Sequence, residues 1–260
     1  MTSVVSAADG YGQVREFQST TEGFRQCRLE GADSLPFVVR TRLGGSCSQG
    51  VETWPNLEKV RQQIRFENKI TGYDCFDTPW TKSGKEILAL FDADCLHFNV
   101  IDSQSTRGST SLLSPNMASV MRGSPVDESM WLSYVISPRS TQCGPLHEDP
   151  PFGSVWQRIV SGSKIWYCLD KKKFDLASFN TNRKLTELNV EQRQTHGLGK
   201  SRPPPPDMIS LAQENFVYRV VLNAGDFISV PTSWPHAVET TTKSVGVAGY
   251  GPVPEDVAVH

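Results

Sequence analysis

Residues 154–169 read SVWQRIVSGSKIWYCL, two short runs rich in β-branched and aromatic residues on either side of Gly162. Such residues favour extended strands, and a glycine between two strand-like runs predicts a hairpin turn. Residues 217–231, VYRVVLNAGDFISVP, repeat the pattern, with a second turn predicted at Ala224-Gly225-Asp226. With the strand expected in WLSYVISP, 131–138, these runs predict a barrel or jelly roll rather than a parallel α/β sheet.

The first half of the chain adds helices to this strand-rich part. LPFVVRTR (35–42) alternates like a strand, and PNLEKVRQQIRF (55–66) has apolar residues at helical spacing, with Pro55 at its start. KEILALFDADCLHFNVID (85–102) predicts a short helix followed by a strand. In SLLSPNMASVMRG (111–123), the Ser-Pro pair and the last glycine predict a helix with its N-cap at Ser114 and its end at Gly123. The predicted class is mainly β with flanking helices.

The domain organisation follows from composition. Residues 1–35, rich in Ser, Thr, Gly and Gln, are expected to form an N-terminal flank over the core surface. Residues 36–260 are expected to form a single domain, with core strands at about 132–169 and 217–251. The polar segment between them, about 170–216, contains four consecutive prolines, which cannot enter a sheet. It is therefore expected to be an insert at the barrel rim.

Charge and cysteine usage exclude several classes of protein. Lys and Arg number 26 against 28 Asp and Glu, so no global field draws the chain to nucleic acid or anionic lipid. The N-terminus lacks a basic and then apolar leader, and no apolar run approaches the ~18 residues that span a bilayer. A soluble, intracellular protein without a membrane partner is expected. Six cysteines without a CxxC pair fit neither a disulfide scaffold nor a zinc finger.

GPLHEDPPF (144–152) contains the first candidate metal ligands. Side chains alternate along an extended strand, so His147 and Asp149 share a face. An imidazole and a carboxylate are two thirds of the 2-His-1-carboxylate triad that holds non-haem Fe(II). His236, which follows the strand-rich GDFISVP, is the best candidate for the third ligand. The alternative is a polar loop. The remaining histidines, His97, His196 and His260, are not expected to bind metal.

Lys164 follows His147 by 17 residues and begins the second strand of the predicted hairpin. Its ammonium group is therefore expected to reach the same cavity as the ligands. A 2-oxo acid that chelates iron needs a cation at its far carboxylate, and a buried lysine supplies one. The alternative is a solvated charge beside a polar turn.

HEDPPFGSVWQRIVSGSKIWYCLD (147–170) and NAGDFISVPTSWPHAVETTTKSVGVAG (223–249) together resemble the JmjC family of Fe(II)- and 2-oxoglutarate-dependent oxygenases. The family pattern is H-x-D/E, then G-x-K-x-W/F, then G-D-x-x-x-x-P-x-x-x-x-H, and all three parts are present in order. FNVIDSQSTRG (98–108) is similar to a strand ahead of the site in the lysine-demethylase branch. The resemblance implies a double-stranded β-helix of the jelly-roll or cupin type.

Carried over residue by residue, the resemblance implies that His147, Asp149 and His236 bind Fe(II) and that Lys164 binds the C5 carboxylate of 2-oxoglutarate. Two positions depart from the pattern. Gly144 stands where many demethylases have a threonine hydroxyl, and Gln157 stands where Tyr or Asn is common. The missing hydroxyl makes Thr141 and Gln104 candidates for the second hydrogen bond to 2-oxoglutarate. Trp156 and Trp166 match family aromatics and are expected to belong to the core.

The function implied by the resemblance is that of a dioxygenase that uses O₂ and 2-oxoglutarate. A histone lysine demethylase, acting by N-methyl hydroxylation, is the first expectation, and the nucleus, otherwise the cytoplasm, is its expected location. Three alternatives stay open: a JmjC protein hydroxylase, a catalytically silent JmjC scaffold, and a cupin-like metalloenzyme of another class, such as a zinc site.

The expected partner is a methylated histone tail, which is basic and favours an acidic rim. Four acids ahead of the barrel are candidates for this rim: Asp74, Asp77, Asp92 and Asp94. The segment 158–203, by contrast, holds ten Lys or Arg against four acids, about +6, and could meet DNA or an acidic partner. Solvated surface charge is the commoner explanation of either pattern. Oligomeric state does not follow from the sequence.

Overall fold

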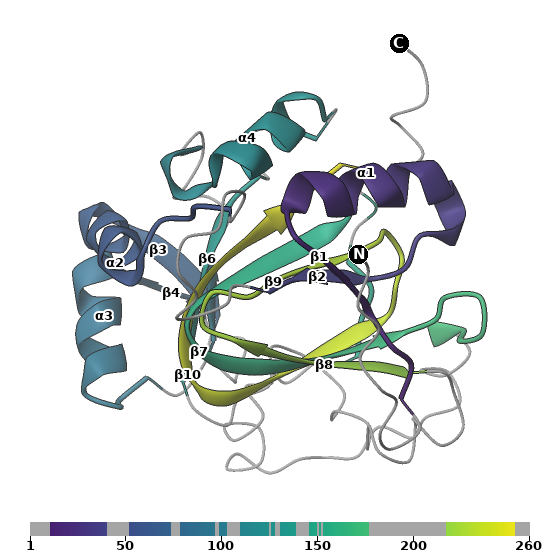
Figure 1. Cartoon of the computed structure of the whole chain (residues 1–260). Coiled ribbons are helices and arrows are strands. Elements are labelled where there is room, and N and C mark those ends of the chain that lie inside the picture. Colours follow the sequence, from purple (N-terminus) through teal and green to yellow (C-terminus); the bar gives the residue numbers. More distant parts are fainter. Residues whose placement is uncertain are drawn as a thin grey trace, which may run out of the picture.

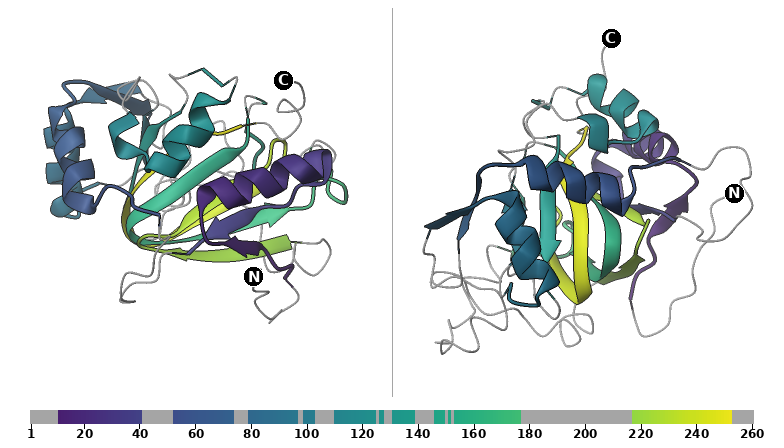
Figure 2. Two further views of the ribbon diagram at one scale, coloured as in Figure 1. Left: turned by 45° about the horizontal axis from the view of Figure 1, so that its top comes forward. Right: turned by 90° about the vertical axis from the view of Figure 1, so that its left-hand side faces the viewer.

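Eight strands form one sheet around the long strand β7 (Val155–Leu169). The computed structural model describes residues 11–40, 52–73, 79–96, 99–102, 110–124, 126–127, 131–138, 146–149, 151, 153–176 and 217–252. Along the sheet the order is β1 (Arg15–Phe17), β2 (Phe37–Val39), β9 (Phe227–Val230), β7, β10 (His236–Tyr250), β6 (Ser133–Ser137) and β5 (Val100–Asp102), while β8 (Val217–Asn223) also pairs with β7. The sheet curves into a barrel (Figures 1 and 2). The predicted mainly β, jelly-roll class is confirmed.

Helices cover the barrel from outside in the described part of the chain. They are α1 (Thr20–Glu30), α2 (Leu57–Phe66), α3 (Gly84–Asp92) and α4 (Pro115–Arg122), with 3-10 turns η1 (Gly31–Asp33) and η2 (Thr110–Leu112). α1 packs on α4, and α2 packs on α3 beside the small sheet of β3 (Ile70–Tyr73) and β4 (Pro79–Lys82) (Figure 1). None of the described helices has the length and apolar character needed to cross a membrane.

Local capping chemistry fixes the helix limits. Ser114 accepts a hydrogen bond from the Met117 backbone and Gly123 ends the helix, which confirms the predicted limits of α4. α3 followed by β5 confirms the helix and strand predicted in 85–102. The predicted start of α2 at Pro55 is wrong by two positions, because the Asn56 side chain supplies the N-cap and the helix begins at Leu57.

Both predicted hairpins are wrong. β7 runs without a turn through Gly162, and its second half, from Ser163 onward, pairs with β8. Its first half, Val155 to Arg158, pairs with β9 instead. The turn at 224–226 does form, with the Asp226 backbone donating to the Asn223 carbonyl. However, the strands on its two sides pair with different halves of β7 rather than with each other.

Gly162 lies in an irregular stretch of β7, beside a bulge in its pairing with β10, rather than at a hairpin turn. Its φ is +81°, and the pairing of β7 with β10 shifts register beside it. Before the bulge, Val155 and Gln157 line a cavity inside the barrel; after it, Trp166 does. Odd-numbered side chains therefore face inward before Gly162 and even-numbered ones after it.

The two larger of three apolar clusters among the described residues hold the barrel and its helices together. Outside the barrel, Phe24 of α1 contacts Phe37 edge-on, and Trp156 stacks on Phe227 with ring centroids 5.8 Å apart. Inside, β8 and β9 pack against the second half of β7, and this cluster includes Cys168. The buried thiols serve as packing groups, as expected for reduced cysteines.

The N-terminal segment contributes to both sheet and core. β1 pairs in parallel with β2, and α1 buries Phe24 and Cys27 in the outer cluster. Burial raises the pKa of the Cys27 thiol to about 12. Residues 15–30 thus form part of the sheet and of the core, and do not only cover the surface. The domain boundary at residue 35 stays a prediction.

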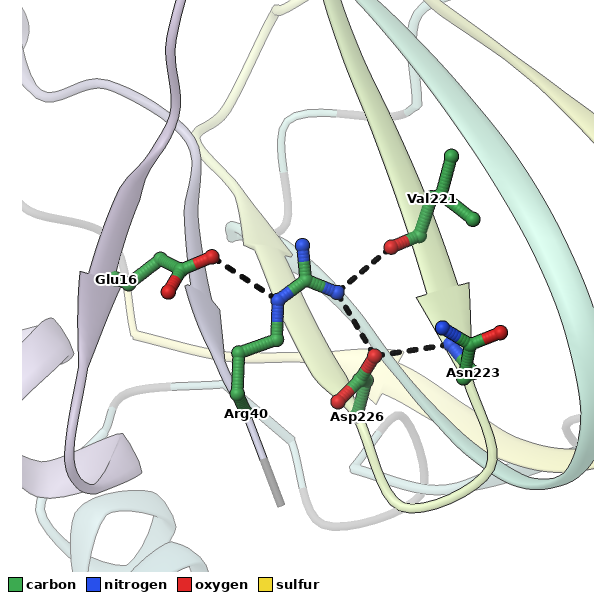
Figure 3. A network of polar contacts seen from close by, with 5 residues as sticks. All are labelled: Glu16, Arg40, Val221, Asn223 and Asp226. Carbon is green, nitrogen blue, oxygen red and sulfur yellow. Dashed lines mark hydrogen bonds and ion pairs between the residues drawn. The ribbon is translucent and has the colours of Figure 1, made fainter. Parts of the chain in front are cut away.

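An arginine beside β2 ties the N-terminal strands to the barrel turn (Figure 3). The Arg40 guanidinium donates to the Glu16 carboxylate at 3.1 Å, to Asp226 at 2.8 Å and to the Val221 carbonyl at 2.6 Å. Asp226 also accepts from the Asn223 backbone at 2.9 Å. Charge-assisted hydrogen bonds of this kind are stronger than neutral ones, so the cluster fixes the turn that redirects the chain along β7.

Substitution of Gly162 by alanine is expected to destabilise the protein by about 2–4 kcal/mol, since a positive φ and a close contact both disfavour a side chain. The new Cβ would lie 2.3 Å from the Lys243 carbonyl oxygen. Gly31→Ala is the matched control, because Gly31 also has positive φ, +56°, but nothing lies within 4 Å of its Cβ position. Urea denaturation should show a loss of only about 1 kcal/mol there. Equal losses would contradict the role of the bulge.

Candidate metal centre

Backbone pairing brings the two candidate histidines together. The His147 amide donates to the His236 carbonyl at 3.0 Å, and the His236 amide donates to the His147 carbonyl at 2.8 Å, as in an antiparallel bridge. The ring centroids lie 4.5 Å apart. His236 begins β10, whose other neighbour at this position is Cys168 of β7. The ligand from the segment before β7 is therefore placed beside the ligand that opens β10.

The donor atoms of His147, Asp149 and His236 all lie within 4.8 Å of one another. His236 Nε2 is 3.3 Å from Asp149 Oδ2, and His236 Nδ1 is 2.9 Å from the Trp234 carbonyl oxygen. Because a carbonyl only accepts hydrogen bonds, Nδ1 carries a proton, which makes Nε2 the ring atom that can offer a lone pair to a metal. Two imidazoles and a carboxylate are the donor set of non-haem Fe(II) sites, so these residues fit that metal.

Trp166 restrains the ring of His236. Its indole stacks on the imidazole with centroids 5.2 Å apart and planes 19° apart. The indole Nε1 donates to Gln157 Oε1 at 3.1 Å. Trp166 is buried in the core as expected, but it also orients a candidate ligand. Trp156 belongs to the outer cluster and faces away from the site.

Asp149 has the electrostatics of an anionic ligand. Burial alone raises its pKa, but the hydrogen bond and charge of His236, the charge of His147 and a hydrogen bond from Tyr250 together outweigh burial, so the pKa lies below its ordinary value. The Tyr250 hydroxyl donates to Asp149 Oδ1 at 3.3 Å. Burial and this carboxylate raise the pKa of Tyr250. The carboxylate is therefore ionised at neutral pH, as metal binding requires.

The triad opens into a cavity of about 130 Å³. Its walls come from both halves of β7, from β6 and from both ends of β10. The other lining residues are Ser133, Val135, Val155, Gln157, Trp166, Val238, Ala248, Gly249 and Tyr250. Mostly apolar walls with a few polar groups are typical of a site for a small organic ligand.

Lys164 is fully buried, so the alternative of a solvated charge is wrong. Its ammonium group donates to Ser137 Oγ at 2.8 Å and to Thr240 Oγ1 at 3.2 Å. Lys164 shares the inward face of β7 with Trp166 but does not line the cavity itself. It pairs with Thr240, four positions along β10 from His236, or ~13 Å at the usual rise per residue. The cation thus lies further along the barrel than the triad.

Several predicted positions lie outside the described residues. They are the two candidates for a second hydrogen bond to 2-oxoglutarate, Thr141 and Gln104, the departure at Gly144, the histidines His97, His196 and His260, and the acids Asp74 and Asp77. Most of the predicted insert, from residue 177 to 216, is also outside them. The roles suggested for these residues stay predictions.

Tyr250, Ser137 and Thr240 contact the site or its cation, and the sequence interpretation missed them. Thr240 follows His236 by four residues, so strand alternation could have placed it on the inward face. Ser137 belongs to β6, and its approach to Lys164 depends on strand order, which no local pattern encodes. The position of Tyr250 depends on β10, whose pairing with β7 shifts register between Thr240 and Gly246.

The predicted charged surfaces change once burial is known. Asp92 pairs with Arg61 at 2.6 Å and Asp94 with Lys243 at 2.8 Å, so both described members of the acidic rim already have basic partners. In the basic segment 158–203, Lys164 is buried inside the barrel. Arg158 is only 8% exposed, with its guanidinium over the ring of Trp54. The segment therefore presents less positive charge to a partner than the count of about +6 suggests.

We expect Asp149→Asn to weaken Mn(II) binding by about 100-fold or more, because the amide keeps the shape of the side chain but removes the anionic ligand. Isothermal titration with Mn(II), a redox-stable substitute for Fe(II), measures this. Asp94→Asn is the control, since Asp94 is an exposed acid paired with Lys243. Equal affinity in wild type and Asp149→Asn would contradict the assignment of this carboxylate as a ligand.

Residues 132–249 match the family model described as JmjC domain, hydroxylase. The matched region runs from just before β6 almost to the end of β10 and contains the triad and Lys164. Among curated proteins, none matches the chain. The match supports the JmjC family and a hydroxylase-type oxygenase that uses 2-oxoglutarate, and the His-Asp-His triad fits iron binding.

Proposed function

We propose that the chain, whose barrel matches the JmjC domain, is an Fe(II)- and 2-oxoglutarate-dependent histone lysine demethylase that acts by N-methyl hydroxylation. The observation that carries the proposal is the placement of the triad and of a buried ammonium group on inward faces of one barrel. The triad suits the end of a dicarboxylate that chelates iron. The buried ammonium group suits the carboxylate at its other end.

The co-substrate is held through Lys164 in this proposal. Ser137 and Thr240 fix the direction of the ammonium group, which binds the C5 carboxylate of 2-oxoglutarate. Val135 and Val238 give the cavity beside the triad apolar walls. Iron, when bound, supplies the oxidative decarboxylation of 2-oxoglutarate by O₂ and the hydroxylation of a substrate C–H bond.

The protein's own residues hold and orient the reacting groups. His147, Asp149 and His236 would hold the metal, and a three-residue ligand set of this kind would leave positions for co-substrate and O₂. Trp166 and the Trp234 carbonyl fix the ring of His236, which preserves the geometry of that ligand set. An N-methyl group hydroxylated in this site breaks down to formaldehyde and a free lysine amine.

The proposed partner is a methylated histone tail and the proposed location is the nucleus, both from the JmjC resemblance. A contact with nucleic acid is proposed only for the exposed part of the basic segment, such as the turn at Lys171, Lys172 and Lys173. Lys172 of this turn already pairs with Asp33, and Lys173 with Asp170. A peptide partner is therefore favoured over nucleic acid.

Protein hydroxylation is the second candidate, and the description of the matched family model as a hydroxylase favours it. The same ligands and the same cation serve both reactions; an ordinary carbon in place of the N-methyl group gives a stable alcohol. A catalytically silent scaffold is less favoured, because both histidines and the carboxylate are present and their donor atoms converge.

The proposal is tested by mass spectrometry of mono-, di- and trimethyl-lysine histone peptides incubated with the protein, Fe(II), ascorbate and 2-oxoglutarate. His147→Ala, which lacks one ligand, is the blank. Loss of methyl mass that disappears in this variant is the expected result. A gain of one oxygen would instead support hydroxylation. Unchanged peptides with no consumption of 2-oxoglutarate would contradict both and favour the silent scaffold.

Lys164→Met is expected to weaken 2-oxoglutarate binding by about 10-fold or more, because an apolar side chain replaces the charge that pairs with the C5 carboxylate. The variant should stay folded, since apolar replacement of a buried charge is often tolerated. Titration of 2-oxoglutarate into the Mn(II)-loaded protein measures the effect. Lys243→Met, which removes a surface lysine, is the control. Unchanged 2-oxoglutarate affinity in Lys164→Met would exclude Lys164 from the co-substrate site.

A further inference from the structure

Tyr250 contacts the candidate metal centre without belonging to its ligand set. Its hydroxyl donates to Asp149 Oδ1 at 3.3 Å, whereas the other carboxylate oxygen, Oδ2, lies 3.3 Å from His236 Nε2. The two oxygens of the carboxylate thus face different partners. One faces the neighbouring ligand, and the other faces a phenol at the end of β10.

The backbone on both sides of Tyr250 is closely confined. At Gly249, a Cβ would lie 2.0 Å from the Trp131 carbonyl oxygen, so only glycine allows this approach. At Gly251, the amide donates to the Ser154 carbonyl at 2.6 Å. Tyr250 itself pairs with Val155 of β7. The phenol therefore extends from a strand end whose position is fixed by its neighbours.

Asp149 lacks such support from its own backbone. Within the described segment 146–149, only His147 pairs with another strand, through the isolated bridge to His236. The direction of the Asp149 carboxylate then depends on the groups that contact its oxygens. His236 at the start of β10 faces Oδ2, and Tyr250 at the confined end of β10 donates to Oδ1.

We infer that Tyr250 is a positioning residue for the metal ligand Asp149, an inference that rests on the proposed metal site. Its hydroxyl holds Oδ1, which leaves Oδ2 to bind the metal as a single-oxygen ligand. A carboxylate that swung to bind through both oxygens would occupy a further coordination position, which co-substrate and O₂ need. Tyr250 thus keeps coordination positions of the metal open and also increases the affinity of the site for the metal.

The test uses Tyr250→Phe in the full chain, since phenylalanine keeps the ring and removes only the hydroxyl. Tyr167→Phe is the matched control. Tyr167 also donates to a carboxylate, that of Glu239 at 3.5 Å, and it lies on the outward face of β7. Isothermal titration with Mn(II) should show about 10-fold weaker binding for Tyr250→Phe and wild-type affinity for Tyr167→Phe. The melting temperatures of the metal-free proteins should agree.

The outcomes distinguish a failure of this inference from a failure of the proposed metal site. Wild-type protein that binds no Mn(II) would overturn both. Mn(II) binding by wild type and by Tyr250→Phe with equal affinity would overturn only the role of Tyr250. An equal loss of affinity in Tyr167→Phe would also overturn it, because the effect would then not depend on contact with Asp149. The electron paramagnetic resonance spectrum of bound Mn(II) should change in Tyr250→Phe alone.

Discussion

The bulge beside Gly162 determines which side chains of β7 face the barrel interior. In a regular strand, residues an odd number of positions apart lie on opposite faces, so Val155 and Lys164 could not both point inward. The irregular backbone at Gly162 changes the alternation, and the positive φ found there is available to glycine. Gln157 from the first half and Trp166 from the second consequently meet in one hydrogen bond inside the barrel. The cation and the cavity both depend on this irregular stretch, where the pairing of β7 with β10 shifts register.

The metal-binding end depends on a second backbone feature, the bridge between His147 and His236. Main-chain hydrogen bonds place two segments side by side without using either imidazole, so both rings stay available as ligands. The Trp234 carbonyl and the Trp166 indole then fix the ring of His236. Backbone pairing thus determines where the ligands lie, and neighbouring side chains determine how they point.

Much of this arrangement follows from short-range chemistry that a sequence displays. The limits of α4 follow from Ser114 and Gly123, whose roles depend only on adjacent residues. The convergence of His147, Asp149 and His236 follows from spacing and from the family resemblance. These features are predictable because each uses a local rule or a motif with several matching positions.

The remaining features depend on pairing between distant strands. A glycine such as Gly162 supports a bulge as readily as a hairpin turn, so its presence alone cannot distinguish them. The partners of Lys164 come from β6 and β10, and only the strand order brings them together. A count of charges also does not show which side chains are buried. The basic segment predicted at the surface therefore includes Arg158, although its side chain packs on Trp54.

The barrel interior holds a few buried polar groups among apolar side chains, and a second apolar core, which packs against the helices, lies on the other face of the sheet. Buried groups such as Lys164 and Gln157 contribute less to stability than well-packed apolar side chains of similar size would. The outer cluster, which includes Phe37, Trp156 and Phe227, buries large aromatic surfaces instead. The larger apolar cluster thus lies on the outer face of these strands, and the candidate site lies on the inner face. Inward substitutions on β7 should therefore alter binding more than folding, and outward substitutions should do the reverse.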